Sequence, residues 1–443
     1  MYRKVLEELV SWKTSHRRKP LVLRGARQVG KTWLMKELAR IAYDDFAYIS
    51  FDKDADAIRI FDETKDPKLI IQRLALMRNK KILPGSTLII LDEIQECPNA
   101  LGSLKYFNEE ANEYHVITAG SLLGTYLAKP ASYPVGKVNI LRIYPLSFDE
   151  YLAAADDGMY QYYSGVKSGS DYVSAFHGKM IEHYKKYLII GGMPECVESW
   201  VNNTDPGEVS TIQEEIVSLY ENDFTKHNAN VNSGRILQVF RSIVPQLAKE
   251  NNEKFMYAAI AKSSRAKDFE DAIEWLVSSG IVYRISNISK PEYPLKAYEM
   301  LNYFKLFLLD TGLVKRMAGL RNKSIMLSES FQFKGQLAEN YVLQQLVPIL
   351  ADEPNFYAFA QDREIDFILQ HGETIIPLEV KSGGSKNAVS FKSYINKHNP
   401  EIAVRYSTKE YLINGAITNV PLYLVGKTFE LASCASESER KQR

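Results

Sequence analysis

Eight residues near the N-terminus have the types and spacing of a loop that binds phosphate. The segment that starts at Gly25 and ends at Thr32 fits the pattern G-x-x-x-x-G-K-[ST] at every position. Its glycines let the backbone bend tightly around a phosphate, and its N–H groups and the start of the next helix attract the negative charge. A chance glycine turn is the alternative. The predicted ATP-binding loop is formed by Gly25, Ala26, Arg27, Gln28, Val29, Gly30, Lys31 and Thr32.

Four side chains in and after this loop could carry out ATP hydrolysis. We expect Lys31 to contact the β- and γ-phosphates and the Thr32 hydroxyl to ligate Mg²⁺. The apolar residues 88–91 are followed by Asp92 and Glu93, which fits a Walker B element. Asp92 would hold the Mg²⁺ through water, and Glu93 would polarise the attacking water. The alternative is that both acids are simply solvated at the end of a strand.

A further polar side chain is expected where the next strand ends. Thr118 and Ser121 stand at the place where a side chain that senses the nucleotide would contact the γ-phosphate or the water. Ser121 fits equally well as the N-cap of a helix that begins at Leu122. Ser121 is therefore a candidate catalytic residue with a structural alternative.

These residues have to be held by strands that end at one edge of a sheet. Four short apolar segments are expected to be strands: 21–23, 46–51, 88–91 and 116–118. The intervening segments 33–41 and 70–77 have helical patterns, as does the N-terminal segment 1–13. Strands that alternate with helices indicate an α/β fold, in which helices cover both faces of a parallel sheet.

The C-terminal third contains a second group of residues that could do chemistry. Apolar residues form a helical stripe within 336–350, and Glu339 lies on that stripe, so we expect its carboxylate to point inward. Residues 363–369 alternate like a strand and place Asp366 on the face opposite the apolar side chains. The same alternation at 378–381 puts Glu379 and Lys381 together on one face.

An acid, a gap of about a dozen residues and then E-x-K resembles the core of PD-(D/E)xK nucleases. Glu339, Asp366 and Glu379 could bind Mg²⁺, and Lys381 could orient the hydrolytic water. An inherited but inert fold is the alternative, as is an ordinary set of solvated or salt-bridged residues.

Six segments, taken in order, resemble a family of prokaryotic AAA-type P-loop ATPases whose members carry a C-terminal domain of unknown function. The resemblance covers nearly the whole chain and implies a nucleotide-dependent ATPase, a winged-helix-like middle and a nuclease-like C-terminal fold. Many members have Gly-Arg just before the Pro-Leu-Ser-Phe segment, where this chain has Gly136-Lys137, and Arg142 is a substitute candidate. If that arginine normally completes a neighbour's active site, the change to Lys137 puts this arrangement in question here, and a homo-oligomer stays one of the expected partners. The matching segments are 24–32, 91–95, 144–150, 191–194, 304–312 and 376–381.

Five parts are predicted on this basis. A P-loop ATPase domain comes first, and a helical linker or lid, a winged-helix-like domain, a PD-(D/E)xK nuclease-like domain with an α/β fold and a disordered tail follow it. Their expected bounds are 1–150, 151–231, 232–325, 326–430 and 431–443.

The middle part raises the question of nucleic acid. Helices followed by a hairpin resemble a winged helix-turn-helix, and Lys262, Arg265 and Lys267 could contact phosphates before or at the start of its third helix. Acidic residues crowd the same helix and would repel DNA: Asp268, Glu270, Asp271 and Glu274. Binding of DNA and a role in packing or dimerisation therefore both stay open.

Composition narrows the class of protein. The 443 residues are 45% hydrophobic and 25% charged, with a net charge of +1, so overall charge does not indicate a nucleic-acid partner. Three widely separated cysteines argue against a disulfide framework. The N-terminus does not read as a signal peptide, and no apolar run could span a bilayer. We therefore expect a cytoplasmic protein without a membrane partner.

These features predict an ATP-driven switch whose cofactors are ATP and Mg²⁺. One function is an ATPase that acts on nucleic acid, and the alternative is an ATP-dependent regulatory or scaffold protein with an inert nuclease fold. A small-molecule kinase is less favoured because no pattern for an acceptor substrate is visible.

Overall fold

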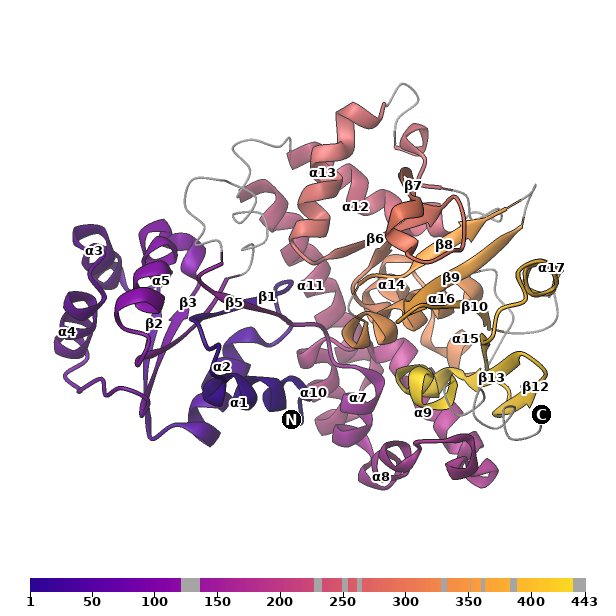
Figure 1. Cartoon of the computed structure of the whole chain (residues 1–443), viewed down its shortest axis with the longest axis horizontal. Coiled ribbons are helices and arrows are strands. Elements are labelled where there is room, and N and C mark those ends of the chain that lie inside the picture. The colour runs from indigo at the N-terminus through magenta and orange to yellow at the C-terminus, as the bar shows by residue number, and fades with distance from the viewer. Residues whose placement is uncertain are drawn as a thin grey trace. The chain divides into compact units, whose positions relative to one another are not determined.

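The structure is a computed structural model with two compact units. It describes residues 1–120, 136–226, 233–248, 254–260, 265–327, 333–350, 352–359, 363–382 and 389–432. The first unit comprises residues 3–145 and 275–281, and the second comprises 1–2, 146–274 and 282–443. Figure 1 shows the elements of each unit, with the labels used below.

The first unit is built on a parallel sheet of five strands. β1 (Leu21–Arg24), β2 (Asp45–Ser50), β3 (Thr87–Asp92), β4 (His115–Ala119) and β5 (Asn139–Arg142) lie in the order β2-β3-β4-β1-β5. All four pairings are parallel. The α/β fold with a parallel sheet that the alternating pattern predicted is confirmed. The sequence did not predict β5, which is short and only half apolar.

Helices cover this sheet on two sides. α3 (Ala55–Glu63), α4 (Pro67–Met77) and α5 (Pro98–Glu110) share one apolar core with side chains of β1 to β4, such as Val22, Ile49 and Leu91. α2 (Lys31–Ala42) packs on β3 and β4, and α1 (Val5–Thr14) packs on α2. Every residue of β3 is buried. This burial explains why residues 88–91 of the strand are apolar before the acid that ends it.

The second unit begins with a helical block. It contains α7 (Phe148–Ala155), α8 (Asp157–Gly165), α9 (His177–Ile190), α10 (Pro194–Asn203) and α11 (Pro206–Lys226). Ser147 and Glu150 form a capping box at the start of α7, which stabilises that end of the helix. The Phe148 ring then contacts four tyrosines edge-on or tilted, at 5.8 to 6.4 Å between centroids: Tyr151, Tyr163, Tyr187 and Tyr341.

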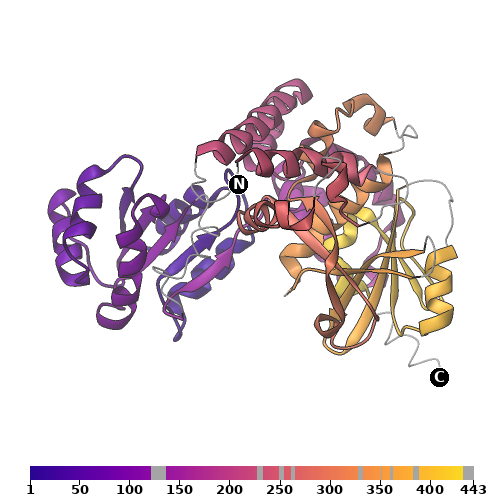
Figure 2. The ribbon, with the colours of Figure 1, turned by 90° about the horizontal axis from the view of Figure 1, so that it is seen from above.

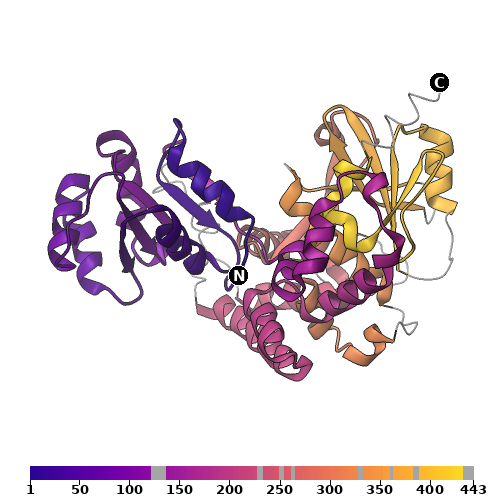
Figure 3. The same ribbon diagram turned by 90° about the horizontal axis from the view of Figure 1, so that it is seen from below.

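An eight-stranded mixed sheet forms the rest of the second unit, and Figures 2 and 3 show it from above and below. Its order is β12-β13-β11-β10-β9-β8-β6-β7. The strands are β6 (Val282–Ile288), β7 (Glu299–Leu308), β8 (Asn355–Ala358), β9 (Glu364–His371), β10 (Thr374–Lys381), β11 (Ala403–Ser407), β12 (Leu412–Asn414) and β13 (Ile417–Pro421). The accompanying helices are α12 (Ser233–Leu247), α13 (Ala266–Ser278), α14 (Thr311–Met317), α15 (Asn322–Met326), α16 (Lys334–Leu346) and α17 (Val389–His398).

The hairpin predicted as the wing of a separate domain belongs to this sheet. β6 and β7 are antiparallel, as a wing would be, but β6 also pairs in parallel with β8, with Asn287 opposite Phe356. β6 is buried along almost its whole length, so it needs a neighbour on both edges. The expected boundary between residues 325 and 326 therefore falls between strands that share one sheet.

A buried carboxylate ties the helical block to this sheet. Asp310 is fully buried at the end of β7. One oxygen accepts hydrogen bonds from Gly192 N at 2.6 Å and Gln344 Nε2 at 2.9 Å, and the other accepts from Leu313 N at 3.0 Å. Burial raises the pKa of Asp310 although these donors lower it. The network joins three segments that are far apart in the sequence.

The same network explains a pair of glycines. Gly191 has a φ of 75°, and a Cβ on it would lie 2.3 Å from Asp310 Oδ1. A Cβ on Gly192 would lie 2.1 Å from the carbonyl oxygen of Leu146. Only glycine fits at both positions, because a side chain would collide with the atoms that hold Asp310 in place.

We expect Asp310→Ala to lower the free energy of unfolding of the second unit by about 3 kcal/mol, because three buried donors lose their acceptor. Urea unfolding followed by circular dichroism would measure the loss. Asp352→Ala is the matched control, since Asp352 makes an exposed ion pair with Lys296 and its loss should cost about 0–1 kcal/mol. Equal losses in the two variants would contradict this role for Asp310.

Candidate functional site

The predicted phosphate loop lies between β1, which pairs with β4 and β5, and the start of α2. Gly25 cannot carry a side chain, because its Cβ would meet the carbonyl oxygen of Ile143 at 2.3 Å. Gln28 and Gly30 have positive φ values of 63° and 93°, which turn the loop into the first residue of α2. The loop thus has the tight bend that close approach to a phosphate requires.

Lys31 lies against the loop that it terminates. Its Nζ donates to the carbonyl oxygens of Gly25 at 2.9 Å and Ala26 at 2.6 Å. Burial lowers the pKa of Lys31 to about 8, although the nearby Glu93 and Asp92 raise it. The ammonium is therefore held by the backbone of the loop and is within reach of the acids at the end of β3.

Asp92 receives hydrogen bonds from two different elements. Thr32 Oγ1 donates to Asp92 Oδ2 at 2.8 Å, and the Tyr48 hydroxyl on β2 donates to the same oxygen at 3.0 Å. The carboxyl ends of parallel strands lie at one edge of the sheet, which brings the ends of β1 and β3 together. A hydroxyl beside a carboxylate is a donor set that suits Mg²⁺, so Thr32 and Asp92 fit the predicted magnesium site.

Glu93 is held in an unusual conformation just beyond the strand. Its φ is 52°, in the left-handed region that non-glycine residues rarely adopt. Gln95 Nε2 donates to Glu93 Oε2 at 2.6 Å. The carboxylate next to Asp92 is therefore positioned by a second side chain of the same turn.

Three residues of this site were not found from the sequence. Arg3 braces the loop by donating to the carbonyl oxygens of Val29 at 3.1 Å and Tyr144 at 2.8 Å. Tyr48 and Gln95 hold Asp92 and Glu93. Gln95 lies inside a segment that carried the family resemblance, whereas nothing in the pattern of residues 1–13 or 46–51 pointed to Arg3 or Tyr48.

The predicted sensor residues have different outcomes. Thr118 lies within β4, and its hydroxyl donates to the carbonyl oxygen of Leu91 at 2.7 Å. It therefore links two strands. Ser121 lies outside the described residues. Lys137, which stands where the family has arginine, pairs with Glu109 at 2.8 Å, and Arg142 is the last residue of β5.

The C-terminal candidates come together in part. In the antiparallel pair of β9 and β10, Phe367 lies opposite Leu378, so Asp366 and Glu379 are neighbours across the two strands. Asp366 Oδ2 accepts the backbone N–H of Val380 at 2.6 Å. Lys381 Nζ lies 3.1 Å from Glu379 Oε1, on the face that the alternation predicted. Glu339 is half-buried on α16.

Cations from other strands also reach these acids. Arg405 of β11 donates its Nε to Glu379 Oε2 at 2.8 Å. Lys305 of β7 is buried and pairs with Glu364. Burial would lower the pKa of Lys305, but the carboxylates of Glu364, Glu339 and Asp366 outweigh it and raise the pKa overall. The sequence prediction included neither Lys305 nor Arg405.

The acids of this cluster are held by neighbouring side chains and backbone. Burial raises the pKa of Asp366 although Lys381 lowers it, and Glu379 raises it further. Across the described parts of the chain, no group of three or more histidine, cysteine, aspartate or glutamate side chains is placed to hold a metal ion. With Lys305 in place, the predicted set of Glu339, Asp366 and Glu379 is therefore not arranged as joint ligands of Mg²⁺.

The basic residues proposed for nucleic acid lie at the start of α13. Arg265 and Lys267 are exposed, and Arg265 N donates to Asp268 Oδ2 at 3.0 Å. Lys262 lies outside the described residues. Arg284 of β6 pairs with Glu270 at 2.6 Å and Glu274 at 2.8 Å. Two of the four acids that were expected to repel DNA thus share one compensating cation from the hairpin.

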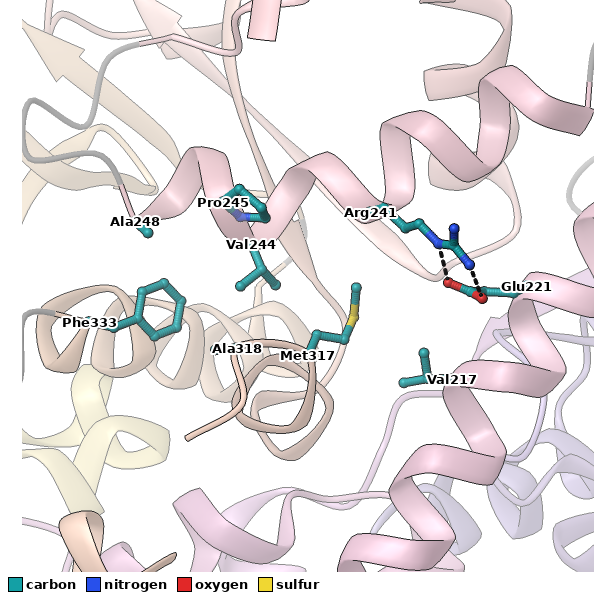
Figure 4. A pocket seen from close by; sticks show the side chains of 9 residues that line it. All are labelled: Val217, Glu221, Arg241, Val244, Pro245, Ala248, Met317, Ala318 and Phe333. Atoms are coloured by element: carbon teal, nitrogen blue, oxygen red, sulfur yellow. Dashed lines mark hydrogen bonds and ion pairs between the residues drawn. The ribbon is translucent and has the colours of Figure 1, made fainter. Parts of the chain in front are cut away.

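An apolar hollow of about 500 Å³ lies elsewhere in the second unit, among α11, α12, α14 and the residue before α16. Figure 4 shows Phe333 at one end and the ion pair of Arg241 with Glu221 at the other. Both bonds of this pair measure 2.8 Å. The hollow is lined by Val217, Glu221, Arg241, Val244, Pro245, Ala248, Met317, Ala318 and Phe333. Its single cation is already paired, which does not suit a phosphate ligand.

Three family models match successive parts of the chain. Residues 17–152 match an AAA domain, residues 181–324 match a domain of unknown function (DUF8612), and residues 334–425 match another (DUF4143). No curated protein matches the chain in sequence. The chain therefore carries an AAA-type P-loop ATPase domain, which implies ATP binding, followed by two domains of unknown function. This part of the expected resemblance is confirmed.

Three of the solved structures that match the chain do so at low identity and low TM-score. The Walker-type ATPase PABY2304 of Pyrococcus abyssi is 14% identical, with a TM-score of 0.44 over 70% of this chain and 95% of that one. The Holliday junction branch migration motor RuvB of Thermotoga maritima is 14% identical, with a TM-score of 0.28 over 64% and 90%. The ORC1 protein of Aeropyrum pernix, solved in complex with DNA, is 12% identical, with a TM-score of 0.28 over 74% and 93%.

No helix in the described ranges has the length and apolar character needed to cross a membrane.

We expect ATP binding to take up a proton between pH 8 and pH 9. Lys31 with a pKa of about 8 is largely neutral at pH 9, and the phosphates should restore its charge, so affinity should fall about tenfold from pH 7 to pH 9. Calorimetry in buffers of different ionisation enthalpy would measure the uptake. Lys31→Arg, which stays charged, should show no such uptake if it binds ATP. Affinity that is constant over this range in the wild type would contradict the prediction.

Proposed function

Because residues 17–152 match an AAA domain, we propose that this chain binds ATP with Mg²⁺ and hydrolyses it. The observation that carries the proposal is the hydrogen bond of 2.8 Å between Thr32 Oγ1 and Asp92 Oδ2. It brings the end of the phosphate loop to the end of the apolar strand β3, as magnesium-dependent hydrolysis requires. Bound Mg²⁺ would neutralise charge on the phosphates.

Each residue of the site has a separate part in this reaction. The backbone N–H groups from Gly25 to Thr32 would bind the phosphates. Lys31 would give up its hydrogen bonds to the carbonyl oxygens of Gly25 and Ala26, and its ammonium would contact the phosphates instead. Tyr48 and Thr32 orient Asp92. Glu93 would accept a proton from the attacking water, and Gln95 sets the position of its carboxylate.

We expect Lys31→Ala to reduce ATP binding or turnover by about 100-fold or more, because it removes the cation that faces the transferred phosphate. Glu93→Gln should still bind ATP but should hydrolyse it about 100-fold more slowly. Binding of a fluorescent ATP analogue and phosphate release would separate the two effects. Lys65→Ala and Glu110→Gln, both at exposed positions of the same unit, are the controls. Wild-type turnover in both test variants would refute the assignment.

Nucleic acid is the target that we propose for this ATP-driven switch. The support is local: α12 and α13 are followed by the hairpin of β6 and β7, and the exposed Arg265 and Lys267 begin α13. Arg284 pairs with both Glu270 and Glu274, which offsets one of their two negative charges and so removes part of the repulsion expected from that helix. DNA-stimulated ATP turnover would test the proposal as a whole.

Replacing Lys262, Arg265 and Lys267 together by alanine should weaken DNA binding uniformly across sequences. The slope of log K against log salt should flatten by about 0.9 for each phosphate that the variant no longer neutralises. Fluorescence anisotropy with duplexes of unrelated sequence at several salt concentrations would measure both effects. Lys290, Lys296 and Lys323 provide a control triple. An unchanged slope would leave this region with a packing or dimerisation role.

A regulatory or scaffold protein with an inert nuclease-like domain is the second candidate function, and a specific observation favours it. The PD-(D/E)xK-like residues Asp366, Glu379 and Lys381 lie on neighbouring strands, but Glu379 is paired with Lys381 and Arg405. Asp366 already accepts a backbone N–H. A nuclease assay in Mg²⁺ and Mn²⁺ would separate the candidates, since cleavage by the wild type would exclude an inert domain.

A further inference from the structure

Lys305 is a buried cation on the sheet of the second unit. It lies on β7, where it pairs with Ile285 of β6, and its side chain is only 3% exposed. Its Nζ forms an ion pair with Glu364 of β9 and lies 4.7 Å from the centre of the Phe356 ring on β8. A lysine so placed has its charge fixed by neighbours from two other strands.

Glu364 is one of three carboxylates around this ammonium. Glu339 of α16 and Asp366 of β9 also act on Lys305 electrostatically and favour its charged form. Two of these three, Glu339 and Asp366, are residues from which the sequence predicted a magnesium site. The positive charge that a metal was expected to supply beside Glu339 and Asp366 is therefore supplied by the ammonium of Lys305.

The remaining acid of the predicted site is compensated separately. Glu379 lies between Lys381 at 3.1 Å and Arg405 at 2.8 Å. The four carboxylates Glu339, Glu364, Asp366 and Glu379 thus face three cations, Lys305, Lys381 and Arg405. A divalent ion would have to enter a cluster that is already close to neutral, and it would be repelled by an ammonium that cannot move into solvent without leaving the core.

We infer that Lys305 is the resident cation of this cluster and takes the place of a divalent metal, so the C-terminal site binds neither Mg²⁺ nor Mn²⁺. This inference rests on the second candidate function and supplies its cause: a nuclease-like fold whose acidic cluster has its charge compensated by lysine and arginine. Removing the ammonium while keeping the carboxylates should convert the cluster into a site for a divalent cation.

The test compares Mn²⁺ binding by full-length chains without nucleotide. All carry Asp92→Asn, so that the ATP site does not contribute. Electron paramagnetic resonance counts bound Mn²⁺, and thermal melting reports stabilisation. Without further change the chain should bind no Mn²⁺ at the cluster. Lys305→Met should melt at a lower temperature than its parent, bind one Mn²⁺ per chain and regain stability with it. Adding Asp366→Asn to Lys305→Met should abolish that binding.

Two control variants distinguish the loss of the Lys305 charge from a general loss of stability. Lys296→Met removes an exposed lysine that pairs with Asp352, and it should change neither Mn²⁺ binding nor melting. Lys305→Arg keeps a cation and should remain without metal. If Lys305→Met does not fold, the comparison is made on the chain that retains Lys305. That chain should bind no Mn²⁺ at the cluster, and Mn²⁺ binding that disappears on Asp366→Asn would contradict the inference.

Two results would overturn the inference. One is Mn²⁺ binding by the chain with Lys305 that is lost on Asp366→Asn, and the other is a folded Lys305→Met chain that binds none. Neither measurement depends on ATP turnover or DNA cleavage, so failure here is distinguishable from failure of the proposed function. Phosphate release and DNA cleavage by the wild type are read in parallel for that purpose.

Discussion

A carboxylate that is wholly removed from water needs donors from several directions, and the second unit is arranged to supply them to Asp310. Gly192 lies just after α9, Leu313 lies at the start of α14, and Gln344 lies in the last turn of α16. A buried charge is costly without such partners, so these three segments can pack in only one way. The glycine pair is fixed by the same requirement, because a Cβ on Gly191 would meet Asp310 itself and one on Gly192 would crowd Gln344, which donates to Asp310.

The same constraint has opposite consequences at the two candidate sites. Lys31 is buried, but its partners are backbone carbonyl oxygens of a loop, which it can give up for the stronger acceptors of a phosphate. Lys305 is buried among carboxylates that have no comparable alternative. A buried lysine that is hydrogen-bonded to neutral acceptors can bind an anionic ligand. A buried lysine that is ion-paired with carboxylates is already neutralised by them. Burial alone therefore does not distinguish a binding residue from a structural one.

A feature could be predicted from the sequence when neighbouring residues determine it, and could not when it depends on residues far apart in the chain. The phosphate loop, β3 and the acids after it are set by consecutive residues, so their positions and the parallel sheet were predictable. Asp366, Glu379 and Lys381 were placed on one face by alternation alone. Arg3, Tyr48 and Arg405 act across gaps of 26 to 44 residues. No local pattern marks such partners, because sheet order brings them together.

Sheet order also links the two largest departures from the sequence prediction. A free wing would have kept β7 and its Lys305 away from the acids on β9. Instead β6 pairs with β8, so the hairpin extends the sheet and carries Lys305 to within reach of Glu364 on β9. The pairing that joins the expected middle and C-terminal domains is thus what delivers the compensating cation. A motif search counts the acids and the lysine of E-x-K, but the chemistry of the cluster depends on a second lysine, which lies 76 residues before Lys381.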